Sequence, residues 1–339
     1  MVTALRKAGF AKVFDTNFTA DLTIIEEGNE FLERLKKNER LPLITSCSPG
    51  WIGYLERFYP ELIPLTSSCK SPMSMLSTIL KTYYAQRVDV DPKKIFVVSA
   101  MPCTAKKYEA SREEHMTPWG APYTDVVITT RGLIWTLKCL GIDFHNLEDD
   151  LFDSPLGVSS GAADIFGTTG GVMEAALRTV YENVTSKELT DLNFEVVRGV
   201  EGVKEATIDI DGLGVNIAVS NGLANAKYLL DKVISGEKQY HVIEIMACPG
   251  GCIGGGGQPF PPQGMNVLDP DLLRMRAKAL YSIDGGKTLR KSHDNPAIDQ
   301  IYEDFLGAPG SHLCHELLHT SYKPKYPRGS QSRYIRGTK

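Results

Sequence analysis

Residues 242–252 read VIEIMACPGGC, are followed at once by IGGGG at residues 253–257, and are the most informative part of the sequence for the fold. The first four residues, VIEI, are mostly β-branched and form the kind of short apolar run that is typical of a buried strand. Cys248 and Cys252 follow with three residues between them, and the glycines beyond them let a backbone approach a bulky inorganic group and offer it N–H donors. The stretch therefore predicts a strand that ends at a metal-binding cysteine pair.

Two further predicted strands also end at cysteines. Residues 41–45 lead into Cys47, and residues 95–99 lead into Cys103. In open α/β sheets ligands bind at the carboxyl ends of the strands, so these thiols can meet the cysteine pair although they are distant in sequence. Four thiolates suit zinc or an iron–sulfur cluster. Structural zinc sites more often use two close pairs, so one pair with two single cysteines favours the larger cluster.

Strands alternate with helices through about residue 260, which indicates an α/β protein with one mainly parallel sheet or two small ones. Beyond Gly254 the composition changes to glycine and proline and then to helical segments, so we expect a helical C-terminal extension. The predicted strands are residues 41–45, 95–99, 126–130, 194–197, 216–220 and 242–245. The predicted helices are residues 22–37, 73–86, 171–183, 225–235, 271–281 and 297–305.

The composition excludes several classes of protein. With 37 Lys and Arg against 41 Asp and Glu, the net charge is −4, which is not the basic field of a nucleic-acid reader. No apolar run approaches the roughly 20 residues of a membrane-spanning helix, and the start MVTALRKAGF has no secretory signal. We therefore expect a soluble, cytoplasmic protein with no nucleic-acid partner. Seven cysteines, an odd number, in so long a chain indicate metal ligands or free thiols rather than a disulfide framework.

Charged residues and histidines are ambiguous when they are taken alone. Glu27, Glu30 and Arg34 share one face of a predicted helix, and such a row usually faces water. Lys106 lies three residues after Cys103 and could donate to anionic ligands, although most lysines are surface charges. The letters HExxH occur at residues 315–319, but no third zinc ligand accompanies them in this last helix, which disfavours a zinc hydrolase.

Three long motifs together resemble a known family. TSCSPGW at residues 45–51, MPCTAKKYE at 101–109 and EIMACPGGCIGGGGQP at 244–259 resemble, in this order, the signature motifs of the FeFe-hydrogenases. The resemblance implies a two-lobed α/β fold, each lobe with a small, mainly parallel sheet flanked by helices. It implies a first lobe at residues 1–150 with the first two cysteine motifs, and a second at 151–260 with the third. A small-subunit-like helical extension at 261–325 and a tail at 326–339 follow.

The resemblance also implies the cofactor, the H-cluster. This is a four-iron four-sulfur cubane joined through one cysteine sulfur to a di-iron unit that bears CO, cyanide and a dithiolate bridge. Cys103, Cys248 and Cys252 match cubane ligands, and Cys252 matches the bridging one. Lys106 matches the lysine that hydrogen-bonds a cyanide. The residues that match the walls of the di-iron pocket are Met101, Pro102, Met246 and Phe166.

A proton route is implied as well, running from the open iron to the surface. The residues that match it are Cys47, Glu27, Ser67, Glu30 and Arg34. This assignment replaces the solvent-facing interpretation of the glutamate row. Heterolysis of H2 needs a nearby base for the proton, and a thiol followed by carboxylates would supply one.

The chain departs from the family pattern at three points. Ser48 stands where relatives carry the fourth cubane cysteine, so either Ser48 or water completes the cubane while Cys47 relays protons, or Cys47 itself becomes the ligand. Met73 stands where glutamine is common. The chain starts late, as a fragment would, and it has no C-x2-C-x2-C-x3-C run. Electrons are therefore expected from ferredoxin or from a diaphorase partner.

The activity implied by these residues is the reversible conversion of H2 to protons and electrons, in a protein whose cluster is installed by maturation enzymes. Two related alternatives remain. One is a non-catalytic iron–sulfur protein of cytosolic cluster assembly, which should lack the proton route and Lys106. The other is an H2-sensing protein, which should lack the relay cysteine at position 47.

Overall fold

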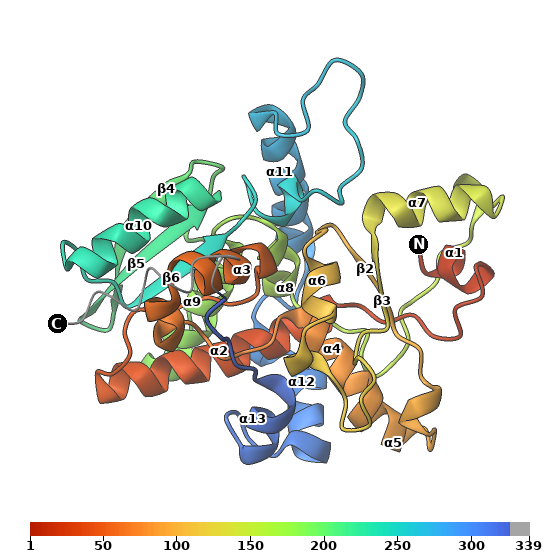
Figure 1. Ribbon diagram of the computed structural model, residues 1–339, viewed down its shortest axis with the longest axis horizontal. Coiled ribbons are helices and arrows are strands. Elements are labelled where there is room, and N and C mark those ends of the chain that lie inside the picture. The colour runs from red at the N-terminus through yellow and green to blue at the C-terminus, as the bar shows by residue number, and fades with distance from the viewer. Residues whose placement is uncertain (326–339) are drawn as a thin grey trace.

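The computed structural model describes residues 1–325, and the predicted tail at 326–339 lies outside them. The larger of its two sheets has four strands. Its strands are β1 (Leu43–Ile44), β6 (Val242–Met246), β5 (Leu213–Asn221) and β4 (Val203–Ile210), in that order across the sheet. The first three are parallel and β4 is antiparallel to β5. Figure 1 shows this sheet on the left, with helices on both sides of it.

Alternate side chains of these strands enter two different cores, because successive residues of a strand point to opposite faces. Leu43 and Val242 pack against α2 (Asn17–Lys37) and α9 (Gly171–Thr185). Their neighbours Ile44 and Ile243 pack against α3 (Pro49–Phe58) and α10 (Leu223–Ser235). β1 and β6 are therefore buried on both faces, which explains why these two strands read as mostly apolar runs.

The second sheet has two parallel strands, β2 (Val98–Met101) and β3 (Val126–Thr129). α6 (Lys106–Ala110) and α7 (Thr130–Cys139) flank it. The small, mainly parallel sheets and their helices confirm the expected fold class. The division at residue 150 stays a prediction, but the sheets do not follow it: β1 pairs with β6, so the first cysteine motif stands on the sheet of the third motif and not beside the second.

One predicted strand is wrong. The segment at residues 194–197 forms a 3-10 turn, η7 (Glu195–Val197), that buries Val197 and pairs with no strand. The strand on this edge is instead β4, which the prediction missed. Asp211 and Gly212 join β4 to β5 in a two-residue turn, both with positive φ, and Asp-Gly is a strong hairpin signal. The Asp-Gly dipeptide is therefore the sequence feature from which a hairpin containing β4 could have been predicted.

The predicted helices are confirmed with shifted ends. α2 begins five residues before the predicted start, and the helix predicted at 73–86 is α4 (Pro72–Ile79), a π-helical turn at Leu80–Tyr84 and α5 (Ala85–Arg87). The C-terminal extension contains α11 (Pro270–Gly286), α12 (Pro296–Ile301) and α13 (His312–Leu318). The remaining α-helices are α1 (Val2–Lys7) and α8 (Gly161–Asp164). Among the helices of residues 1–325, none is long and apolar enough to cross a membrane.

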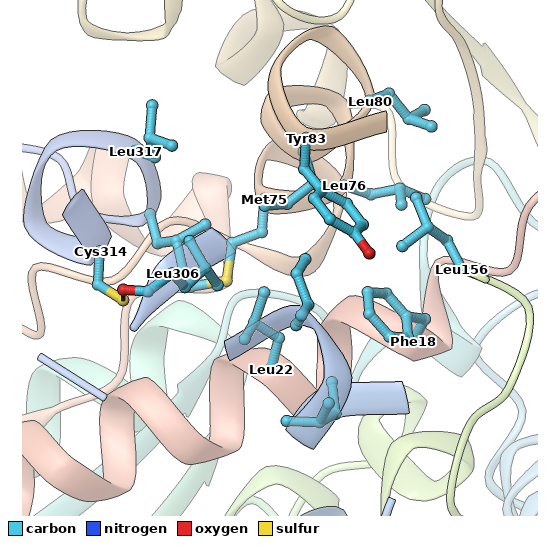
Figure 2. Packing of buried hydrophobic residues seen from close by; sticks show 14 of the residues in the cluster. Phe18, Leu22, Met75, Leu76, Leu80, Tyr83, Leu156, Leu306, Cys314 and Leu317 are labelled. Atoms are coloured by element: carbon cyan, nitrogen blue, oxygen red, sulfur yellow. Dashed lines mark hydrogen bonds between the residues drawn. The ribbon is translucent and has the colours of Figure 1, made fainter. Parts of the chain in front are cut away.

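The extension packs against α4 and against α2, which carries three of the proton-route residues. Figure 2 shows Leu306, Cys314 and Leu317 of the extension beside Leu22 of α2 and Met75 of α4. These side chains belong to one buried apolar cluster. The C-terminal helices are therefore part of the same core as α2, and the residues that follow α13 are held close to α2.

Candidate metal-cluster site

Three cysteine thiols from the two sheets influence one another electrostatically. Burial raises the pKa of Cys252 to about 12, and charge on Cys103 and on Cys248 adds to the increase. Burial also raises the pKa of Cys248, and Cys103 again adds to it. Such thiols ionise readily only when a metal ion stabilises the thiolate. The structure thus brings together the cysteines that end β2 and β6, as expected from the strand ends.

The glycine run packs directly on the second cysteine motif. A Cβ atom on Gly255 would lie 2.3 Å from the Pro102 carbonyl oxygen, and one on Gly257 would lie 2.9 Å from the Pro102 carbonyl carbon. The Gly257 N–H donates to the Pro102 oxygen at 2.9 Å. Only glycine permits this approach. Three convergent thiols beside a closely packed glycine backbone are a donor set that fits an iron–sulfur cubane.

Cys47 and Ser48 are adjacent in sequence and have different surroundings. Burial raises the pKa of Cys47 well above its ordinary value, and charge on Glu27 raises it further. Cys47 packs in a small cluster with Met246 and Phe166. Ser48 begins α3, and its Oγ accepts a hydrogen bond from the Ala247 N–H at 3.1 Å, one residue before the cysteine pair begins.

The predicted pocket residues come from both sheets. Met101 ends β2 and packs with Met73 and Val127, whereas Met246 ends β6 and packs in the cluster that contains Cys47 and Phe166. Met73, at the position where glutamine is common, is buried among these apolar side chains. The carboxyl end of each sheet is therefore surrounded by a small apolar cluster of its own.

Lys106 forms a buried ion pair beside the thiols. Its Nζ lies 2.7 Å from Glu109 Oε2 and donates to the Cys47 carbonyl oxygen at 3.1 Å. Burial lowers the pKa of Lys106, but Glu109 and then Cys103 and Cys47 outweigh it, so the pKa stays above its ordinary value. Glu109 also accepts from the Ser74 hydroxyl at 2.7 Å and from Ser71. The Lys106 ammonium is held next to the cysteines by this pair, and Glu109 is a residue of the site to which the sequence prediction assigned no role.

The row on α2 does not face water. Glu27 and Arg34 are buried, and burial raises the pKa of Glu27 to about 7, although hydrogen bonding to Ser67 opposes the shift. Among the described residues, Glu27 Oε1 has no hydrogen-bond partner. Ser67 Oγ donates to Glu30 at 3.1 Å, and Glu30 pairs with Arg34 at 2.5 Å. The structure therefore places the five proposed proton-route residues in one continuous region.

The HExxH letters do not form a metal site of their own. His315 is exposed on α13, whereas His319 lies just beyond the helix with its two ring nitrogens bonded to Ser68 and Glu26. In a zinc protease each histidine of the pair needs one ring nitrogen free to bind the ion, whereas both nitrogens of His319 are engaged. His319 instead contacts Glu26 of α2. The letters HELLHT drew attention to this histidine in the sequence, but they did not indicate its partner.

Comparison with known proteins agrees with this geometry. The family model described as "Iron only hydrogenase large subunit, C-terminal domain" matches residues 1–256, and that of the "Iron hydrogenase small subunit" matches residues 270–325. The second match corresponds to the predicted small-subunit-like extension. Together the two models cover most of the chain.

Three individual proteins illustrate the similarity. The chain is 51% identical to "NADP-reducing hydrogenase subunit HndD" of Solidesulfovibrio fructosivorans, over 95% of this chain and 55% of that one. It is 31% identical to "Cytosolic iron-sulfur assembly component 3" of Bos taurus, over 96% of this chain and 69% of that one. The solved structure of an apo [FeFe]-hydrogenase HydA1 variant from Chlamydomonas reinhardtii is 44% identical, with a TM-score of 0.82, over 95% of this chain and 86% of that one. The chain thus spans little more than half the length of the hydrogenase subunit from Solidesulfovibrio fructosivorans.

Proposed function

The chain belongs to the iron-only hydrogenase family, and from that premise we propose that it catalyses the reversible conversion of H2 to protons and electrons. The observation that carries the proposal is the buried series from Cys47 through Glu27 and Ser67 to Glu30, which leads from the thiols to an open cleft. A protein that only stores or transfers a cluster has no need of buried, titratable groups in a row.

The cofactor of this domain is the H-cluster, a four-iron four-sulfur cubane linked to a di-iron subcluster. When bound, it supplies H2 cleavage and one-electron transfer. Cys103, Cys248 and Cys252 would hold the cubane, with Cys252 as the bridging ligand. Lys106 would face the cyanide, because its ammonium stays charged and lies beside Cys47.

We propose that Ser48 or a water bound to it completes the cubane. In support, Ser48 Oγ lies at the Ala247 amide, next to the cysteine pair, whereas Cys47 packs with Phe166 near Glu27. A Ser48→Cys variant should change the electron paramagnetic resonance spectrum and the reduction potential of the cubane, because thiolate and oxygen ligands differ in electron donation. Unchanged spectra would contradict oxygen ligation and favour Cys47 as the ligand.

Proton movement would begin at Cys47 and continue to Glu27. A carboxyl group whose pKa is about 7 exchanges protons readily in both directions near neutral pH. Ser67 can pass a proton between the two glutamates, since its hydroxyl both donates and accepts. Lys106 keeps its proton and orients groups by charge, because Glu109 stabilises the ammonium form.

We further propose that a ferredoxin or a diaphorase-type subunit exchanges electrons with the cluster, that maturation enzymes install the di-iron unit, and that the protein works in the cytoplasm. A non-catalytic role of the kind named for the relative from Bos taurus is the second candidate. Lys106 and the buried glutamates argue against it, and the retained Cys47 argues against an H2 sensor.

An infrared spectrum tests the proposal. Protein made anaerobically with the maturation enzymes should show bound CO and cyanide bands, and these bands should shift when H2 is added. Iron and sulfide without such bands would mean that the chain carries only a cubane, and the non-catalytic candidate would replace the hydrogenase.

A further inference from the structure

We propose that His319, in the C-terminal extension, ends a second branch of the proton route and exchanges protons between Glu30 and the water of the surface cleft by way of Ser68. The inference rests on the proposed hydrogenase function. It assigns to the extension a part in the reaction, in addition to its part in the core.

Arg34 cannot itself be the group that carries protons away from Glu30. A guanidinium keeps its proton in proteins. Arg34 is also buried, and it donates to the Leu65 and Thr66 carbonyl oxygens at 2.8 and 3.1 Å while it pairs with Glu30. It therefore fixes the position of Glu30, and protons that reach this carboxyl group pass either to the cleft that Glu30 itself lines or to another neighbouring group.

Hydrogen bonds continue from Glu30 in a different direction. Ser68 Oγ lies 3.3 Å from Glu30 Oε2 and 2.8 Å from His319 Nδ1. The other ring nitrogen, His319 Nε2, lies 3.1 Å from Glu26 Oε2. Ser68 thus lies between a route carboxylate and an imidazole, and the Cys69 thiol lies between the same two groups at the longer distances of 3.9 and 4.0 Å. Histidine ordinarily changes charge between about pH 5 and 8.

The transfer step balances in protons. A protonated Glu30 donates to Ser68 Oγ, and the Ser68 hydroxyl hydrogen passes to His319 Nδ1. Glu30 becomes a carboxylate, Ser68 is again a hydroxyl, and His319 becomes an imidazolium whose Nε2–H points at Glu26. Rotation of the Ser68 hydroxyl resets the relay, and the reverse sequence brings a proton in.

Several titratable and charged groups surround the His319 ring. Glu26 faces the ring from α2; burial raises its pKa, but hydrogen bonds from His319 and Tyr302 outweigh burial and hold the pKa below its ordinary value. Glu30 and its partner Arg34 lie beyond Ser68, and the Cys69 thiol lies 4.0 Å from Nδ1. His315 is a further titratable neighbour, and its ring centroid lies 4.4 Å from that of His319.

A path to water is present on the far side of the ring. His319 and the exposed His315 line a cleft of about 480 Å³ that Glu30 and Arg34 also line. The Nε2–H of His319 is bonded to Glu26, which also lines this cleft, so a proton on His319 can leave to cleft water by way of Glu26. The same cleft admits small buffer molecules, and this permits a chemical test.

The test compares two histidines with matching contacts. His319→Gln removes the titrating ring but keeps hydrogen-bonding atoms, and His293→Gln is the control. His293 Nδ1 lies 3.0 Å from Thr179 Oγ1 and its Nε2 lies 2.8 Å from Glu182, so it bridges a hydroxyl and a carboxylate as His319 does, but it lies outside the route.

H2 evolution from reduced methyl viologen is measured on the matured protein across about pH 6 to 8. His319→Gln should lower the rate about three- to tenfold at pH 7, and added imidazole should restore most of it, because a mobile base replaces the missing ring. His293→Gln should match the unmodified protein. The infrared bands should be the same in all three.

Ser68→Ala supplies an independent check if His319→Gln folds poorly. It should lower the rate similarly, but imidazole should not restore it, since the bridge from Glu30 is lost. An unchanged rate and pH profile in His319→Gln would overturn the proposed His319 branch but not the hydrogenase proposal. A loss of rate that imidazole does not restore and that His293→Gln shares would do the same. Unmodified protein whose infrared bands ignore H2 would overturn the hydrogenase proposal and the branch with it.

Discussion

Glu27 and Glu109 are both buried beside the cysteine site, yet their charge states differ. Burial raises the pKa of Glu27 to about 7. Burial also acts on Glu109, but Lys106 and then His115 outweigh it and hold the pKa below its ordinary value. The two carboxyl groups have the same chemistry and nearly the same exposed fraction, 5% and 6%. The partner, and not the depth of burial, separates a titrating group from a permanent charge.

The two carboxyl groups differ in charge state because Glu109 is paired with its nearest cation and Glu27 is not. Lys106 lies one helical turn before Glu109 on α6 and contacts it directly at 2.7 Å. The cation nearest to Glu27 on α2 is Arg34, which pairs with Glu30 instead. A proton route needs groups without a fixed counter-charge, whereas a ligand-orienting charge needs one. Four predictions test this contrast, from the largest expected effect to the smallest.

Replacement of Glu27 should abolish turnover without harming the fold. Glu27→Gln removes the only titrating group between Cys47 and Ser67, so the rate of H2 evolution should fall by about 10²- to 10⁴-fold. The thermal midpoint should not decrease, because an uncompensated buried carboxyl group is removed. A variant with more than half of the normal rate would show that protons bypass this position.

Removal of one partner of the buried pair should destabilise the protein strongly. Glu109→Gln leaves the Lys106 ammonium buried without its counter-charge, and the free energy of unfolding should fall by about 3 to 5 kcal/mol. The double variant Lys106→Met with Glu109→Gln should recover most of that loss. Denaturant unfolding of both single variants and of the double variant measures the coupling, and simple additivity would contradict a tight pair.

The pH dependence of stability should reveal the raised pKa of Glu27. An unfolded glutamate has a pKa of 4.5, so the folded state binds the proton more tightly and stability falls as the pH rises from 4.5 toward about 7. This group alone accounts for about 3 kcal/mol across that window. Glu27→Gln should remove that part, so its advantage in thermal midpoint over the unmodified protein should grow between pH 5 and 8. A constant difference would mean that Glu27 is ionised throughout.

An exposed pair on the same helix should have no comparable effect. Glu33 and Lys37 lie 2.7 Å apart on α2, with side chains that are more than half exposed. Glu33→Gln should leave the free energy of unfolding and the rate of H2 evolution unchanged within error, because solvent screens such pairs. A clear loss of activity would extend the proton route along the outer face of α2.

Local patterns in the sequence were sufficient to predict that strands precede the cysteines. Strand ends before Cys103 and Cys248 follow from short apolar runs, and the glycines at 254–257 follow from the need for close backbone approach. The strand prediction for residues 194–197 is wrong because β-branched residues also occur in a 3-10 turn, which here buries only Val197 and pairs with no strand. Strand pairing is not local, so the joining of β1 to β6 did not follow from chain order.

The sequence by itself determined which chemistry is possible here: the thiols, their place after strands, the glycine run and the carboxylates at helical spacing. Only the tertiary structure decided the state of those groups, because a pKa depends on the charges and dipoles within a few ångströms and these come from distant segments. Glu27 titrates since Arg34 is paired with Glu30, and Lys106 stays charged since Glu109 contacts it. His319 joins this chemistry because the extension packs on α2 and leaves its ring between Ser68 and Glu26.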